Sequence, residues 1–150
     1  MEIKKIDKIA LGSDHAGYSL KEKIKAHLLS RGMEVLDMGT DEAVSCNYTL
    51  FAHKVCEAVT GGEAPLGILV CGTGIGMSMA ANKHAGIRAA CCENTFSARM
   101  TRMHNDANVL CLGERVVGYG LACDMVDLFI DTPFEGGRHQ ARVDDINALD

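Results

Sequence analysis

The stretch Gly67-Ile68-Leu69-Val70-Cys71-Gly72-Thr73-Gly74-Ile75-Gly76 decides the fold of this chain. A short, continuous apolar run is typical of a parallel strand that is covered on both faces. Ligands of open α/β sheets bind beyond the carboxyl ends of strands, where glycine-rich turns let backbone N–H groups approach an anion. The stretch therefore predicts a buried strand, an anion-holding turn and the start of a helix.

Cys71 closes this strand at the edge where ligands bind. A thiolate there would face backbone donors and the positive end of the following helix, which favours its activation. A cysteine that closes a strand is, however, more often a small buried hydrophobe. The local sequence leaves both interpretations of Cys71 open.

Strand and helix signals alternate along the chain. The expected strands are residues 6–11, 33–38, 68–71, 86–92 and 108–112, and the expected helices are residues 18–31, 50–59, 75–83, 95–103, 120–130 and 138–149. Such alternation implies right-handed crossovers and a parallel sheet between helix layers. We therefore expect one domain over residues 1–150, a three-layer, Rossmann-like α/β/α sandwich with a five-stranded parallel sheet.

Composition sets the outer bounds on function. The chain has 150 residues, of which 47% are hydrophobic, and a formal net charge of −5, which argues against partners such as nucleic acid or acidic membranes. No apolar run approaches the roughly 18 residues of a spanning helix. The segment Met1-Glu2-Ile3-Lys4-Lys5-Ile6-Asp7 has no apolar core of a secretory signal. We expect a cytoplasmic protein.

Cysteine usage supports that expectation. The seven cysteines form no C-x-x-C pair, their number is odd, and several lie in apolar runs: Cys46, Cys56, Cys71, Cys91, Cys92, Cys111 and Cys123. This pattern favours reduced, buried thiols over disulfides or a zinc site. The six histidines also lack metal-ligand spacing, so we expect no metal.

Two polar clusters flank expected strands. Asp14-His15 follows the first strand, and its carboxylate could bind hydroxyls, orient an imidazole or simply cap the next helix. The segment 104–108 precedes the last strand, so His104 lies at the opposite edge from Cys71 in the same subunit. His104 is either a solvated loop residue or a contributor to a neighbouring subunit's site.

A third cluster lies near the end of the sequence. Arg138 and Arg142 are four residues apart, which puts them on one helix face as a clamp for phosphate or carboxylate, or as a solvated basic patch. Arg115, after the last strand, either joins that clamp or pairs with a local carboxylate. The glycines before Arg138 would let an anion approach.

A nucleotide cofactor is not expected. Gly72, Gly74 and Gly76, with Glu93 further on, resemble a dinucleotide fingerprint. The spacing is G-x-G-x-G, however, so the last glycine comes one residue early. No G-x-x-x-x-G-K-[ST] run occurs either.

The clusters together resemble a known family. The matching segments follow in order through nearly the whole chain: residues 12–17 (GSDHAG), 71–76 (CGTGIG), 80–83 (AANK), 86–89 (GIRA), 104–110 (HNDANVL), 113–118 (GERVVG) and 135–139 (EGGRH). They strongly resemble the B-type ribose-5-phosphate isomerase and galactose-6-phosphate isomerase family. The resemblance implies a metal-free aldose–ketose isomerase of a phosphorylated sugar, without cofactor, built as a dimer or dimer of dimers with sites between subunits.

The resemblance implies catalytic roles. Cys71 matches the family's general base and Thr73 its partner hydroxyl. His104 matches the residue that opens the sugar ring across the subunit interface. The hole for the enediolate oxygen is matched by turn amides, those of Gly72, Gly74, Ile75 and Gly76 among them.

The resemblance also implies a set of substrate contacts. Asp14 and His15 match substrate-binding positions, and Asn105 lies beside the ring opener. Phosphate-binding positions are matched by three arginines: Arg115, Arg138 and Arg142.

One segment departs from the family pattern. Asn47-Tyr48-Thr49 stands where the family usually has Asp-Tyr-Pro, so Tyr48 is kept as a residue that packs against the sugar. The lost carboxylate and proline leave several alternatives to ribose 5-phosphate. They are another sugar phosphate (allose, galactose or a four-carbon sugar) and a non-catalytic sugar-phosphate-binding subunit.

Overall fold

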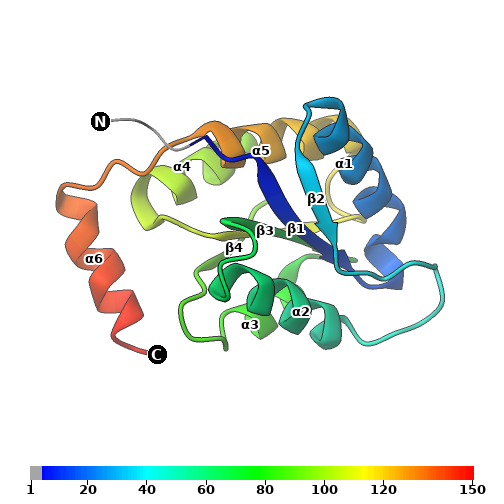
Figure 1. Cartoon of the computed structure of the whole chain (residues 1–150), viewed down its shortest axis with the longest axis horizontal. Coiled ribbons are helices and arrows are strands. Elements are labelled where there is room, and N and C mark those ends of the chain that lie inside the picture. Colours follow the sequence, from blue (N-terminus) through cyan, green and yellow to red (C-terminus); the bar gives the residue numbers. More distant parts are fainter. Residues whose placement is uncertain (1–4) are drawn as a thin grey trace.

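Five parallel strands form one sheet between two helix layers in the computed structural model, which describes residues 5–150 (Figure 1). The strands are β1 (Lys8–Ser13), β2 (Glu34–Asp37), β3 (Leu66–Cys71), β4 (Ala89–Cys91) and β5 (Val109–Gly113). The helices are η1 (a 3-10 turn, His15–Gly17), α1 (Tyr18–Ser30), α2 (Tyr48–Thr60), α3 (Ile75–Ala81), α4 (Thr95–Asn105), α5 (Tyr119–Asp131) and α6 (Arg138–Asn147). The predicted α/β/α class is confirmed.

The strand order is β2-β1-β3-β5-β4. From β1 the chain moves to one edge of the sheet, β2, whereas from β3 it crosses to the other edge, β4, and then returns to place β5 between β3 and β4. The order therefore reverses between β1 and β3, and the carboxyl ends of these two strands form the crevice where α/β sheets bind ligands. Asp14 follows β1 and Gly72 follows β3, so both predicted segments reach this crevice.

Two apolar cores hold the layers together. Helices α1, α4 and α5 cover one face of the sheet around Ile68 and Leu110, and α2 and α3 cover the other around Leu69 and Cys111. Alternate residues of β3 thus enter opposite cores, which explains the continuous apolar run. Helix α6 stands apart from both layers and contacts α4 (Figure 1).

Strand β4 is shorter than the predicted 86–92. Gly86 has φ of +82° and Ile87 closes a turn onto His84, so the chain is not extended before Arg88. The outer edge of β4 bonds to an amide side chain instead of another strand, because Asn82 both donates to Ala89 O (2.9 Å) and accepts from Ala89 N (2.8 Å). These bonds also end α3 at Ala81, before the predicted residue 83. The other element bounds differ from prediction by about two residues, which is ordinary at element ends.

All seven cysteines are free thiols, and five of them are buried. Cys91, predicted to be buried within an apolar run, is exposed because β4 is the edge strand. Within residues 5–150 no helix is long and apolar enough to cross a membrane. The segment Met1–Asp7, which the sequence argues is no secretory signal, lies partly outside the described residues.

A buried ion pair fixes α1 to β2. Lys21 is fully buried, and its Nζ donates to both carboxylate oxygens of Asp37 at 2.8 and 2.9 Å. Burial alone would raise the pKa of Asp37, but hydrogen bonds from Lys21, Gly39 N and Lys25 outweigh it and hold that pKa below its usual value.

Lys21→Met is expected to destabilise the fold by roughly 3 kcal/mol at pH 7, because it leaves the Asp37 carboxylate short of its buried partner. Lys8→Met, which breaks the more exposed 3.2 Å pair with Glu34, is the control and should cost less than about 1 kcal/mol. The depressed pKa gives stabilisation that is present above about pH 4 and is lost as pH falls through the folded-state pKa. Urea unfolding at pH 7 and in acid checks this, and a Lys21→Met cost that does not shrink in acid would contradict it.

Candidate active site

The turn after β3 holds the Cys71 thiol against a backbone donor. Gly74 N donates to Cys71 Sγ at 3.1 Å, and Ile75 N donates to Thr73 Oγ1 at 3.2 Å. Gly74 has φ of +80°, and a β-carbon there would lie 2.9 Å from the Leu112 carbonyl carbon, so the turn requires glycine. Two of the predicted hole amides therefore point at the thiol and at its neighbouring hydroxyl, where they can stabilise negative charge.

Asp14 and His15 lie beside this turn. Asp14 is buried, its N–H donates to Val70 O, and its Oδ1 accepts from Gly17 N at 3.0 Å, so the capping interpretation is confirmed. His15 Nδ1 accepts from Cys46 N at 3.2 Å. In the neutral ring, that bond assigns the proton to Nε2 and leaves Nε2 as the ring's hydrogen-bond donor.

Tyr48 and Arg115 complete this first cluster. A β-carbon at Gly76 would lie 2.7 Å from the Tyr48 ring, so glycine lets the ring press against the start of α3. Arg115 N donates to Gly72 O at 3.0 Å, and a β-carbon at Gly72 would lie 3.4 Å from the Arg115 guanidinium. Arg115 thus belongs with the thiol turn, and the expectation that it joins the other two arginines is wrong within one chain.

A second cluster surrounds an open hollow of about 330 Å³. It consists of His104, Asn105, Arg138 and Arg142, and His139 also lines the hollow. His104 was expected in a polar loop but lies in the last turn of α4, which runs on to Asn105 and ends where Asp106 takes φ of +46°. Arg138 and Arg142 are exposed on one face of α6, as their spacing predicts, and Arg142 donates to Arg138 O.

The two clusters lie at opposite edges of the sheet. Cys71 is in register with Gly113 at the end of β5, whereas His104 and Asn105 precede the start of β5. A strand rises about 3.3 Å per residue, so the two ends of this five-residue strand are roughly 13 Å apart. One chain therefore does not bring His104 to its own Cys71.

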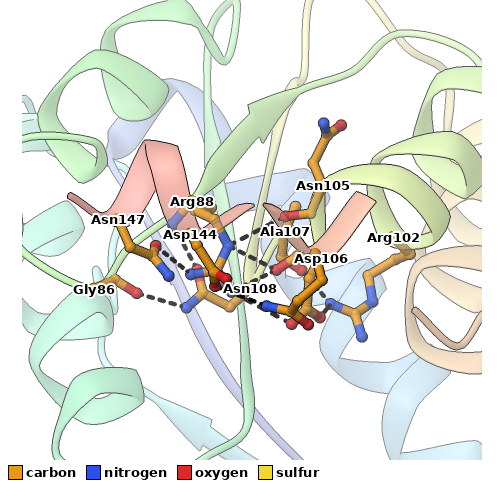
Figure 2. Close-up of polar contacts among 10 residues, drawn as sticks. Gly86, Arg88, Arg102, Asn105, Asp106, Ala107, Asn108, Asp144 and Asn147 are labelled. Carbon is orange, nitrogen blue, oxygen red and sulfur yellow. Dashed lines mark hydrogen bonds and ion pairs between the residues drawn. The ribbon is translucent and has the colours of Figure 1, made fainter. Parts of the chain in front are cut away.

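Arg88 is a positioning residue that sequence reasoning missed. Its guanidinium donates to Asn105 O, to Asp106 O and to Asn147 Oδ1 at 2.8–3.1 Å (Figure 2). These bonds tie the end of α4 to the last turn of α6. The second cluster is thus held on a fixed frame. No clear signal of this role was present in the sequence, because Arg88 lay within the expected strand 86–92, whereas the observed strand β4 begins only at Ala89.

Glu135 and His139 were also missed as neighbours of His104. The His104 and His139 rings stack with centroids 4.4 Å apart, and Glu135 Oε2 lies 3.1 Å from His139 Nε2. Linear spacing gave no sign of this group, because the packing of α6 on α4 brings it together. Within residues 5–150 it is the one group of three or more such side chains whose ligand atoms lie close together, within 4.8 Å of one another.

Three of the other four buried cysteines lie in the apolar cores on either side of the sheet. Burial raises the pKa of Cys56 to about 12 and that of Cys92 to about 11, and it raises the pKa of the fully buried Cys111 as well. These three cysteines are therefore protonated at neutral pH and belong to the core. A larger hollow of about 580 Å³ lies after β2, around Phe51 and Lys54, and contains none of the predicted site residues.

Comparison with known proteins decides the family. The profile of the ribose/galactose isomerase family matches residues 9–146. The chain belongs to this family. Ribose-5-phosphate isomerase B of Escherichia coli is 52% identical over 143 residues, which cover 95% of this chain and 96% of that enzyme.

Members of the ribose/galactose isomerase family with solved structures share the fold. Ribose-5-phosphate isomerase B of Clostridium thermocellum superposes with a TM-score of 0.94 at 55% identity, covering 95% of this chain and 96% of that one. The family also includes a relative with another substrate. The 4-deoxy-4-sulfo-D-erythrose isomerase of a Clostridium species is 41% identical over 85% of this chain and 80% of its own length.

Proposed function

We propose that this family member interconverts ribose 5-phosphate and ribulose 5-phosphate by ring opening and a cis-enediolate. The observation that carries the proposal is the Cys71 thiol, held by the Gly74 amide at the switch point of the sheet. Its similarity to ribose-5-phosphate isomerase B enzymes supports the choice of sugar.

Ring opening comes first, because only the open sugar exposes a carbonyl. The step needs a group that accepts and donates a proton near the ring oxygen, and imidazole does both near neutral pH. We assign it to His104, with Asn105 beside it in the same hollow.

Proton transfer between C2 and C1 follows. The Cys71 thiolate removes the proton from C2, giving an enediolate. The hydroxyl proton passes from O2 to O1, and Cys71 returns its proton at C1, which leaves the carbonyl at C2. The oxygen charge that develops is stabilised by turn amides, and each such donor is worth about 2.7–4 kcal/mol in comparable sites. The positioning of the sugar hydroxyls is assigned to Thr73 within this turn and to three residues around it: Asp14, His15 and Tyr48.

The phosphate end is assigned to arginines. Arg138 and Arg142 present two guanidinium groups on one helix face, and Arg115 lies by the thiol turn. Binding energy from the remote phosphate fixes the register of the reacting carbons.

We further propose that each site is shared between two subunits of a homodimer, or of a dimer of dimers. The separation of Cys71 from His104 within one chain supports this, because each cluster supplies half of the machinery. Exposed apolar side chains around the thiol turn offer a contact surface: Ile75, Met79, Phe96 and Val116.

Turnover is expected to need no metal and no nucleotide, since thiolate, imidazole and amides supply every proton transfer and charge contact in the scheme. Prolonged chelation followed by dialysis should leave kcat and KM unchanged. A loss of activity that a divalent ion restores would contradict this expectation. Free thiols throughout the chain support a reducing compartment such as the cytoplasm, as proposed from the sequence.

A substrate panel tests the function. Purified protein is incubated with four-, five- and six-carbon aldose phosphates, including ribose, allose and galactose phosphates, and ketose formation is followed. Ribose 5-phosphate should give the highest kcat/KM. A preference for another sugar would instead reflect the Asn47-Tyr48-Thr49 segment, where Asn47 directly precedes α2 and Tyr48 lies against Gly76 of the thiol turn. Binding without turnover of any sugar would favour the non-catalytic alternative.

A further inference from the structure

The second cluster contains a group of potential metal ligands that the proposed chemistry does not use. His104, Glu135 and His139 each present one ligand atom, and the three atoms lie within 4.8 Å of one another. His139 is buried, with 8% of its surface exposed, and its Nε2 has no hydrogen-bond partner within residues 5–150. The Glu135 carboxylate lies 3.1 Å away, at ion-pair distance but outside hydrogen-bond geometry.

We propose that these three side chains form an inhibitory site for a divalent transition-metal ion, with Zn²⁺ as its best-matched occupant. Two imidazole nitrogens and one carboxylate oxygen, with a fourth position open, are a ligand set that zinc takes. Ligands at about 2.0–2.2 Å from a tetrahedral ion lie roughly 3.3 Å apart, close to the Glu135–His139 separation.

The remaining adjustment is a tilt of one ring. The two imidazoles stack with their planes 15° apart, so their nitrogens do not yet converge on a single point. His104 is only half-buried and has room to turn toward the other two ligands. Arg138 and Arg142 line the same hollow and repel a cation, which sets the affinity well below that of a structural zinc site.

The expected effect is reversible inhibition, and this part rests on the proposed function. A metal-bound imidazole has its nitrogen lone pair engaged, so His104 could no longer exchange a proton with the sugar ring oxygen. Phosphate bound by the two arginines would compete indirectly, because substrate and ion share the hollow. Chelation would therefore leave the enzyme fully active, whereas added zinc would stop it.

Cobalt and zinc binding to the full-length, chelator-treated protein tests the site. Co²⁺ reports its ligands in its absorption spectrum, since thiolates add intense charge-transfer bands that histidine and carboxylate do not. Zn²⁺ affinity is then measured by competition with a coloured chelator, alongside isomerase activity at each zinc concentration. We expect d–d bands without thiolate bands, and loss of turnover in step with zinc occupancy.

Glu135→Gln removes one ligand and keeps the side-chain shape. It should weaken zinc binding and zinc inhibition at least about tenfold, while basal kcat/KM and the thermal midpoint stay unchanged. Glu57→Gln is the matched control, because Glu57 also lies four residues from a histidine, His53, at 3.1 Å. This control should bind zinc as the wild type does.

Equal zinc affinity in wild type and Glu135→Gln, a weakening in Glu57→Gln instead, or cobalt spectra with thiolate bands would overturn the metal site. If Glu135→Gln weakens binding but zinc-loaded wild type keeps full turnover, the metal site stands and its inhibitory role is refuted. In that case the assignment of ring opening to His104 fails as well.

Discussion

Replacing Cys71 with serine is expected to lower kcat by about 10²- to 10⁴-fold, the range that a positioned general base supplies. A hydroxyl ionises far less readily than a thiol, so it cannot take the C2 proton at neutral pH. The fold and KM should change little, because serine is close in size and can still accept the Gly74 N–H that Sγ accepts at 3.1 Å.

Cys91→Ser is the matched control for this experiment. Cys91 Sγ lies 3.8 Å from Thr73 O, behind the same turn, but the residue is exposed on the edge strand. Partial desolvation of the thiol, together with the nearby Cys71 and Glu93, raises the pKa of Cys91. Its loss should leave kcat near the wild-type value. Steady-state kinetics and thermal unfolding of both variants decide the matter. Near-normal turnover in Cys71→Ser would remove the general-base assignment.

Mixing two inactive variants is expected to restore activity. Cys71→Ser and His104→Ala, combined in equal amounts under conditions of subunit exchange, give dimers of which half are mixed. Each mixed dimer has one site with both defects and one intact site. About a quarter of all sites should therefore work if exchange is random and the dimer is two-fold symmetric. The measurement is ketose formation before and after exchange.

Exchange itself needs an independent control. Differently tagged wild-type subunits, purified through both tags, report whether mixed dimers form. If mixed dimers are present and activity stays at the level of the separate variants, both residues act within one subunit. The separation of about 13 Å along β5 would then have to close by a rearrangement within the chain.

The fold could largely be predicted from the sequence, because the local hydrophobic patterns match the positions of the strands and helices in the sheet and its helix layers. The apolar run before Cys71 is buried on both faces, and alternation of strand and helix signals predicted the layers and the parallel pairing. Strand β4 was the exception. Its ends are set by the side-chain amides of Asn82 and Asn108, which replace ladder bonds, and a side chain's choice of a distant backbone partner leaves no periodic signal.

Part of the candidate site could also be predicted, because some of its residues are neighbours in the sequence. Residues adjacent in sequence, such as those of the thiol turn, keep their neighbours in the fold, and the capping alternative for Asp14 followed from its residue type. Groups assembled by helix packing were not readable. His104 meets Glu135 and His139 because α6 rests on α4, and Arg88 reaches both helices from the strand edge.

Because the thiol turn and the arginine pair lie on different elements at opposite edges of the sheet, selection can act on them independently. Substitutions on α6 would change the charge and reach of the arginines that we propose to hold the substrate's phosphate, while the turn after β3 is left intact. The relative that isomerises a four-carbon sulfosugar handles a sulfonate, which carries less charge than a phosphate and ends a shorter chain. In a fold arranged in this way, substitutions on α6 alone could let the protein accept a substrate with a different charged end, while the residues proposed for proton transfer stay the same.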